Sequence, residues 1–200
     1  PGVFGARACG SRGGRAGLTA VRSLNGQGVI LPIKHQENSR DGTISIQLTV
    51  NGRQVSVDIP PQLTLLDLLR DRLNLKGAKR SCDLQVCGAC TILVNGMAVS
   101  ACTYLSYEAR GAEVLTIEGM ADGNTLHPIQ QAFVDNGAFQ CGFCTPGMIL
   151  AAKSLLDEVS RPSEEKVKEY MQGNICRCTG YRKILEAILD AANKIGGQAS

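Results

Sequence analysis

The chain has 200 residues, of which 44% are hydrophobic and 20% charged, and its formal net charge at pH 7 is +3. Residues 1–40 hold six of the Lys and Arg residues and one acidic residue, so residues 41–200, with fifteen basic and seventeen acidic residues, are close to neutral. A neutral body with no Trp, four Tyr and four Phe lacks the basic face and aromatic platforms that bind nucleic acid. No apolar run approaches the roughly 18 residues of a membrane-spanning helix.

Residues 1–42 are rich in Gly and Arg and show no helical or strand periodicity, which predicts a flexible basic extension. Such a segment could become ordered against an acidic partner subunit. It contains Cys9, which stands apart from the other eight of the nine cysteines. The segment has neither the apolar stretch nor the paired arginines of an export signal, so we expect a cytoplasmic protein.

The first patterned stretch predicts a β-hairpin followed by a helix. Apolar and polar residues alternate over residues 44–50 and 55–59, and Asn51-Gly52 between them is typical of a two-residue hairpin turn. Thr64 then provides a predicted N-cap for a Leu-rich helix over residues 65–73. We therefore expect a helix packed on a small sheet.

The next stretch predicts a loop and more strands. Residues 76–90 have few apolar anchors and carry three cysteines, which indicates a loop wrapped around a ligand. Residues 91–94 and 97–102 predict a second hairpin, and residues 114–117 a further strand. Together these elements predict a compact β-plus-helix domain over residues 43–120.

Four short helices are predicted in residues 121–200, which favours a helical bundle. The first ends at Gly137 and the last before Gly196-Gly197, because Gly commonly follows a helix end. Polar N-caps and Pro in a first turn mark helix starts. The predicted starts are Pro128, Pro146, Ser163 and Thr179.

Eight of the cysteines form two quartets. In the first, Cys82-x4-Cys87-x2-Cys90 is followed by Cys102, which is the spacing of plant-type [2Fe–2S] ligation. Small residues keep this loop free of bulk, so its backbone amides can surround an anionic cluster. The predicted hairpin returns Cys102 as the fourth ligand.

The second quartet is Cys141-x2-Cys144 together with Cys176-x-Cys178. Both pairs precede predicted helix starts, and free N–H groups at helix N-termini stabilise thiolates and an anionic cluster. Below about 80 residues a hydrophobic core alone gives marginal stability. A cluster in each half would supply a cross-link, since metal binding is then coupled to folding.

Other uses of the cysteines are less consistent with the spacing. Four thiolates can also hold zinc, although a Cys-x-Cys pair is unusual in common zinc modules. Rieske-type ligation needs two histidines, and neither His35 nor His127 lies near a cysteine pair in sequence, which favours structural or surface roles for both. Short spacings suit a metal better than the long-range disulfides of secreted proteins.

The chain resembles the small iron–sulfur subunit of the molybdenum hydroxylase family, the xanthine oxidase and aldehyde oxidoreductase group, over about residues 43–195. Three motifs carry the resemblance: CDLQVCGAC at residues 82–90, QCGFCTPG at residues 140–147 and NICRCTGY at residues 174–181. The first occurs in many ferredoxins, whereas the other two together are specific to this family.

The resemblance implies an α+β fold: a plant-ferredoxin-like β-grasp domain over residues 43–120, then an all-α four-helix-bundle domain over residues 121–200. It implies two [2Fe–2S] clusters. The ligands would be Cys82, Cys87, Cys90 and Cys102 for the first, and Cys141, Cys144, Cys176 and Cys178 for the second.

The resemblance also implies where the clusters lie in a larger complex. The second cluster would lie nearer a molybdopterin (molybdenum) cofactor held by a large subunit, and the first nearer FAD on a further subunit. The positions of Gln140 and Cys144 would contact the molybdopterin. The residues alone leave a plainer alternative for Gln140, an exposed or helix-packing amide.

We therefore expect an electron-transfer subunit of a multi-subunit molybdenum-dependent oxidoreductase, which relays electrons from molybdopterin to FAD or an external acceptor. No pair of side chains carries a catalytic signature, so substrate chemistry and substrate choice would belong to the large subunit. The alternatives are a freestanding two-cluster ferredoxin and, less consistent with the spacing, a four-cysteine zinc assembly module.

Overall fold

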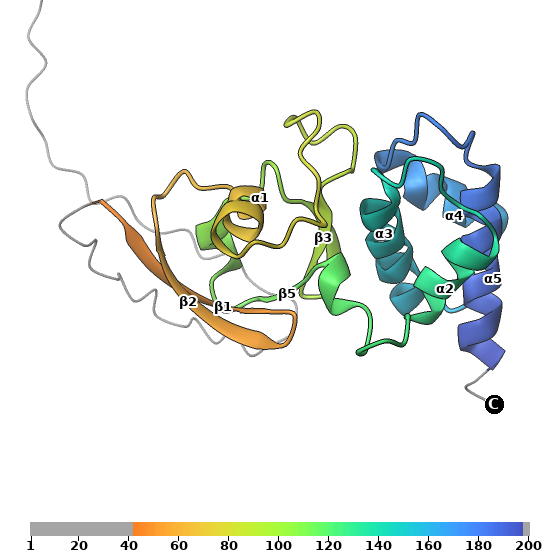
Figure 1. Cartoon of the computed structure of the whole chain (residues 1–200), viewed down its shortest axis with the longest axis horizontal. Coiled ribbons are helices and arrows are strands. Elements are labelled where there is room, and N and C mark those ends of the chain that lie inside the picture. The colour runs from red at the N-terminus through yellow and green to blue at the C-terminus, as the bar shows by residue number, and fades with distance from the viewer. Residues whose placement is uncertain (1–41, 198–200) are drawn as a thin grey trace, which may run out of the picture. The chain divides into compact units, whose positions relative to one another are not determined.

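A computed structural model describes residues 42–197 of the chain (Figure 1). The predicted basic extension, with Cys9 and His35, lies outside the described residues. The described part contains a five-stranded sheet with strand order β2-β1-β5-β3-β4 and a set of helices.

The first hairpin is confirmed. Strand β1 (Ile44–Val50) pairs antiparallel with β2 (Arg53–Ile59). Asn51 and Gly52 adopt φ angles of 50° and 75°, the left-handed values that such a turn requires and that Asn and Gly tolerate best. Strand β1 also pairs in parallel with β5 (Glu113–Leu115), which lies far along the chain.

The second hairpin consists of β3 (Thr91–Val94) and β4 (Met97–Ser100) and is shorter than predicted. Strand β4 ends at Ser100 because the Ser100 carbonyl accepts the N–H groups of Thr103 and Tyr104 at 3.3 Å, which turns the chain. The expected strand to residue 102 was therefore too long. Cys102 lies in this turn.

The predicted end of the last strand also needs correction. Strand β5 stops at Leu115, and residues Ile117–Gly119 form a 3-10 turn. The Asn51 side chain accepts the N–H of Thr116 at 2.9 Å and donates to its hydroxyl at 2.9 Å. The first of these bonds occupies the Thr116 N–H, with which the strand could have continued its pairing.

The Leu-rich helix has its predicted cap but an unexpected shape. The Thr64 hydroxyl accepts the N–H of Asp67 at 3.2 Å. After α1 (Leu65–Asp67), the backbone widens into a π-helix over Leu68–Arg72, so the expected single α-helix over residues 65–73 was wrong in its hydrogen bonding. Across both parts the inner Leu side chains are still buried: Leu65, Leu66, Leu68 and Leu69 are all 0% exposed.

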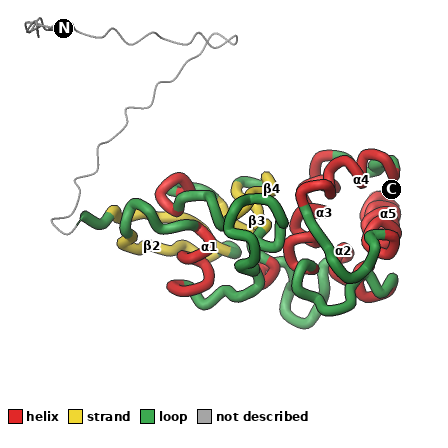
Figure 2. The backbone as a smooth tube through the Cα atoms, turned by 90° about the horizontal axis from the view of Figure 1, so that it is seen from above, coloured by secondary structure: helices red, strands yellow, loops and turns green. Residues whose placement is uncertain are grey.

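Four α-helices follow, and they pack against one another (Figures 1 and 2). The Ser163 cap is confirmed, because its hydroxyl accepts the N–H of Lys166 at 3.2 Å. Gly137, with φ 59°, follows the first of them as predicted. The helices are α2 (Pro128–Asp135), α3 (Thr145–Glu158), α4 (Glu164–Tyr170) and α5 (Arg182–Gly197).

Both predicted limits of the last helix were wrong. Helix α5 begins at Arg182, not at a Thr179 cap, because the Thr179 hydroxyl donates to Cys176 Sγ and accepts the N–H of Tyr181 within the preceding loop. At the other end Gly196-Gly197 lies inside the helix. Ile195, directly before these glycines, still packs against the core of α2–α5.

Strand β3 is buried on both faces and connects two hydrophobic cores. Ile92 and Val94 belong to the core between the sheet and α1, whereas Leu93 belongs to the core of α2–α5. This follows from the alternation of side chains along a strand. Helix α3 packs on β3 and β4, and Ser154 donates a hydrogen bond to the Gly96 carbonyl at 2.9 Å.

Candidate metal centres

The loop that carries Cys82, Cys87 and Cys90 is folded around the Cys82 sulfur. Cys82 Sγ accepts the backbone N–H groups of Leu84 at 3.4 Å, Val86 at 3.5 Å and Cys87 at 3.4 Å. The loop bends through left-handed φ angles at Asp83 (55°), Gln85 (59°) and Gly88 (68°). Amide groups thus converge on a sulfur, as an anionic ligand requires.

The four thiols of the first quartet fall into two pairs with different environments. Cys82 interacts with Cys87, and the amide hydrogen bonds to Cys82 lower its pKa to about 6. Cys90 interacts with Cys102, and burial raises the pKa of Cys90 to about 12. A buried pair of thiols becomes a pair of thiolates when it binds a metal, because a coordinated thiol is deprotonated outright.

The second quartet has the same paired arrangement. Cys141 Sγ and Cys178 Sγ lie 3.6 Å apart and are exposed, while Cys144 interacts with Cys176 closer to the core. Burial raises the pKa of Cys144 to about 12. The N–H of Phe143 lowers the pKa of Cys141, as a donor to a thiolate does.

Hydrogen bonds to the Cys176 sulfur replace one of the two helix ends that we expected at this quartet. Helix α3 does begin directly after Cys144, but α5 begins four residues after Cys178. The Thr179 hydroxyl instead donates to Cys176 Sγ at 3.1 Å. Burial raises the pKa of Cys176. The Thr179 hydroxyl and nearby N–H groups together lower this pKa by more than burial raises it, so the net shift is downward.

The paired thiols suit a binuclear cluster better than a single ion. A tetrahedral zinc site needs four ligands around one point. In an all-cysteine [2Fe–2S] cluster each iron takes two of the four thiolates. The two pairs of each quartet match that donor set.

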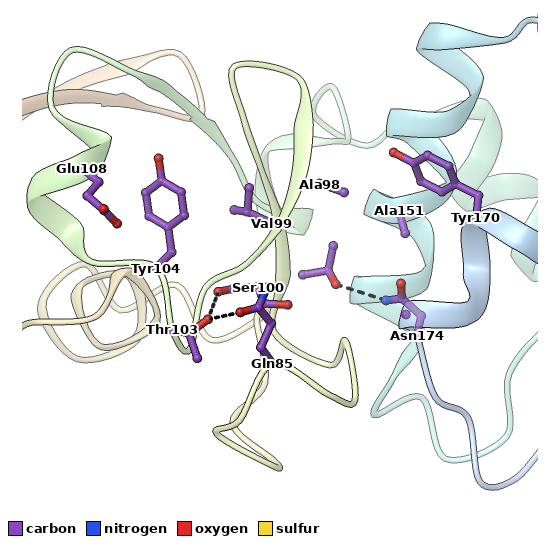
Figure 3. Close-up of a pocket in the computed structure, with 12 residues that line it drawn as sticks. Gln85, Ala98, Val99, Ser100, Thr103, Tyr104, Glu108, Ala151, Tyr170 and Asn174 are labelled. Atoms are coloured by element: carbon purple, nitrogen blue, oxygen red, sulfur yellow. Dashed lines mark hydrogen bonds between the residues drawn. The ribbon is translucent and has the colours of Figure 1, made fainter. Parts of the chain in front are cut away.

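The two cysteine loops are in direct contact, which the sequence did not reveal. The Ile175 N–H donates to the Cys87 carbonyl at 2.9 Å. The Asn174 side chain, 7% exposed, donates to the Gly88 carbonyl at 3.0 Å and to the Thr91 hydroxyl at 3.1 Å. Figure 3 shows Asn174 reaching from the helical side toward the sheet. The only sequence signal was the place of Asn174 in the third motif.

The contact between the loops leaves no room for a larger residue at Gly147. A Cβ at this position would lie 2.3 Å from the Gly88 carbonyl oxygen. Beside the contact is a hollow of about 460 Å³ whose lining includes Gln85, Thr103 and Asn174 (Figure 3). Thr103 donates to the Gln85 side chain at 3.0 Å within this lining.

The structure also shows the surroundings of Gln140 and His127. Gln140 is exposed directly before Cys141, and the aromatic residues Phe139 and Phe143 on either side of this pair are 41% and 46% exposed. His127 is structural, as expected, because its Nδ1 accepts the Ile129 N–H at 3.3 Å and so caps α2. Burial lowers the pKa of His127.

Two known families match the chain. Residues 48–121 match the family described as "2Fe-2S iron-sulfur cluster binding domain", and residues 116–189 match the family described as "[2Fe-2S] binding domain". The first match contains all four cysteines of the first quartet and the second match all four of the second. Each quartet therefore lies within its own iron–sulfur family region.

The chain also matches whole proteins. It is 44% identical to the nicotine 6-hydroxylase small subunit of Paenarthrobacter nicotinovorans, over 78% of this chain and 93% of that protein. It is 43% identical to the aldehyde oxidoreductase iron-sulfur-binding subunit PaoA of Escherichia coli (strain K12), over 75% of this chain and 72% of that protein.

A solved structure agrees with these sequence matches. A chain of quinoline 2-oxidoreductase from Pseudomonas putida 86 superimposes with a TM-score of 0.75 at 40% identity, covering 78% of this chain and 98% of that chain. No helix among the described residues is long and apolar enough to span a membrane. The chain therefore belongs to the small iron–sulfur subunits of the molybdenum hydroxylase family, which are parts of molybdenum-dependent oxidoreductases.

Proposed function

We propose that this chain carries two [2Fe–2S] clusters and relays electrons from a molybdopterin centre on a large subunit to FAD on another subunit or to an external acceptor. A ferredoxin-like β-grasp domain over residues 43–120 would hold the first cluster, and a helical domain over residues 121–200 the second. The observation that supports this most strongly is the geometry of the cysteines: two quartets of paired thiols stand on loops joined by the bond from Ile175 to Cys87.

When bound, a [2Fe–2S] cluster accepts and donates one electron at a time. The residues of this chain have two tasks in that process. Amide N–H groups at Cys82 and the hydroxyl of Thr179 stabilise negative charge on ligand sulfurs. The Asn174 amide and the Ile175 N–H hold the two loops at a fixed separation. The chain needs no acid–base or nucleophilic residue of its own.

The exposed side chains support a direction for the relay. Gln140 and Cys141 are exposed at the second quartet, which supports a contact of Gln140 and Cys144 with molybdopterin on the large subunit. At the first quartet, Leu84 is 73% and Val86 60% exposed, which suits contact with an electron acceptor. In this proposal, electrons enter at the second cluster and leave at the first.

Cysteine variants test the proposed partition of ligands. The full chain, coexpressed with its large subunit, should contain about four iron and four sulfide per chain by the stoichiometry of two [2Fe–2S] clusters. Cys144→Ser should remove one of two electron paramagnetic resonance (EPR) signals after dithionite reduction, and Cys87→Ser the other. Zinc in place of iron, or loss of both signals from either single variant, would contradict the proposal.

A further inference from the structure

Exposed apolar side chains gather around one groove beside the second quartet. Leu126 is 40%, Val134 52% and Phe139 41% exposed, and all three line a hollow of about 340 Å³. They stand on α2 and the segments that flank it, next to α3 (Figure 1). Single exposed apolar residues are ordinary on a protein surface, but a contiguous group of them marks an interaction site.

The floor of the groove belongs to the core, and its lining is uncharged. Phe133 and Ile149, which are 1% and 6% exposed, form part of the core of α2–α5 and also line the groove. None of its described lining residues is Asp, Glu, Lys or Arg. Thr145 also lines the groove, and its hydroxyl is buried with no hydrogen-bond partner among the described residues.

The groove is continuous with the loop that holds the second quartet. Gly142, which lies between Cys141 and Phe143, is one of its lining residues. Phe143 is 46% exposed and extends the apolar surface along this loop. A partner that approached Gln140 and the exposed Cys141 would therefore come next to the groove.

We propose that the groove between Leu126, Val134 and Phe139 docks an uncharged, apolar segment of the large molybdenum subunit. The proposal rests on the function proposed above, in which Gln140 faces the cofactor held by that subunit. We choose this occupant because the groove is continuous with the loop that carries Gln140 and Cys141. The uncharged lining agrees with it, because permanently assembled interfaces are more hydrophobic than those of transient redox partners.

Introduction of a positive charge into the uncharged groove tests the proposal. Val134→Lys and Leu126→Lys place a cation at exposed positions of the groove, so folding should be unaffected. Met97→Lys is the matched control, because Met97 is 66% exposed on β4 and does not line the groove. The full chain and a tagged large subunit are purified separately, and their affinity is measured by titration calorimetry.

Each groove variant should weaken binding to the large subunit at least tenfold, while Met97→Lys leaves it within twofold of the wild type. The EPR signals of the isolated variant chains should equal those of the wild type, which separates a docking defect from a failure of the electron-transfer proposal. Unchanged affinity in both groove variants would overturn the docking proposal, as would an equal loss in the control.

Two further results would assign the groove to another occupant and so also overturn the proposal. The first is conversion of a dimer of this chain to a monomer by Val134→Lys, measured by sedimentation, because the occupant would then be a second copy. The second is a loss of amide-exchange protection in α2 when residues 1–41 are deleted in the absence of the large subunit. The occupant would then be that segment of the chain itself.

Discussion

At the scale of single residues, hydrogen bonds to the cysteine sulfurs are the interactions most able to tune the proposed clusters. The Thr179 hydroxyl donates to Cys176 Sγ at 3.1 Å in a partly buried setting. Such a bond stabilises the more negative, reduced cluster more than the oxidised one, because the acceptor gains charge on reduction. Loss of the hydroxyl should therefore make the second cluster harder to reduce.

Thr179→Val removes the hydroxyl and keeps the shape of the side chain. We expect the reduction potential of one cluster to fall by about 30–60 mV, which corresponds to roughly a three- to tenfold change in a one-electron equilibrium. Thr179→Ser retains the hydroxyl and should leave the potential near that of the wild type. An EPR-monitored redox titration gives both values. Equal potentials in the Val and Ser variants would contradict this role.

Asn174 controls the contact between the two cysteine loops. Asn174→Ala leaves the buried Gly88 carbonyl and Thr91 hydroxyl with one partner fewer, which should cost about 1–3 kcal/mol of unfolding free energy. We also expect a weaker magnetic interaction between the reduced clusters, visible as a smaller EPR splitting. Chemical denaturation and low-temperature EPR measure the two effects.

Ser154→Ala is the matched control for Asn174. Ser154 makes a similar hydrogen bond to the Gly96 carbonyl at 2.9 Å, but it does not touch either cysteine loop. It should lower stability without changing the splitting. If both variants change the splitting alike, or neither does, Asn174 has only a structural role.

At the scale of elements, the N-terminal end of α3 packs against the first cysteine loop through Gly147. A methyl group there would approach the Gly88 carbonyl oxygen to 2.3 Å, and a backbone atom cannot move aside as a side-chain tip can. Gly147→Ala should therefore destabilise the protein by about 1–3 kcal/mol, the usual cost of overpacking. It should also broaden the EPR signal of the first cluster.

Gly173→Ala is the control for that substitution, because a Cβ at Gly173 meets no atom within 4 Å and Gly173 has no positive φ angle. Its melting temperature should stay near that of the wild type. Differential scanning calorimetry of the two variants decides the point. Similar melting temperatures for both would show that the loop contact is not tight.

The N-terminus of α2 should respond to pH through His127. Its Nδ1 accepts the Ile129 N–H, and burial lowers its pKa in the folded state. Stability from the neutral imidazole is therefore present above the unfolded pKa of about 6.5 and is lost as the pH falls through the lower folded value. Protonation also removes the acceptor that caps the helix.

His127→Asn keeps a good N-cap and cannot titrate. The difference in melting temperature between pH 7 and pH 5 should therefore be smaller in this variant than in the wild type. Comparing the two proteins cancels the contribution of surface carboxylates, which titrate in both. An equal pH dependence would mean that His127 does not contribute to the acid sensitivity.

The elements show which features a sequence can reveal. The Asn51-Gly52 turn and the Thr64 and Ser163 caps depend on groups within three residues of one another, so local pattern predicted them. Thr179 is of a residue type that often caps helices, but its hydroxyl donates a hydrogen bond to Cys176 Sγ, and α5 begins later. The sequence pattern contained no information about that competition.

The same distinction applies to the candidate site. Spacing predicted the two cysteine quartets, and the structure brings the thiols of each quartet close together. The contact of Asn174 with Gly88, 86 residues earlier, depends on how α3 and β3 pack and has no local signature. The apolar groove was equally hidden, because the exposed Val134 and the buried Phe133 are neighbours in sequence and differ only in their helix face.

At the scale of the whole molecule, the two quartets form one electron-transfer path only if the proposed clusters exchange electrons across the contact between the two cysteine loops. In the proposed relay, the chain would contribute ligands, hydrogen bonds to sulfur and a fixed separation between the clusters. Its relatives include small subunits of hydroxylases and oxidoreductases. In this proposal, substrate chemistry belongs to the large subunit that would cover Gln140, and the groove beside Gln140 would provide the docking surface.

The most direct test of the central proposal is an EPR-monitored redox titration of the full chain in complex with its large subunit. Two distinct S = 1/2 signals should appear, each integrating to about one spin per chain, as expected for two reduced [2Fe–2S] clusters. Addition of the complex's substrate without dithionite should produce the same two signals. A single signal, or two signals that substrate never elicits, would contradict a two-cluster relay fed by the molybdenum subunit.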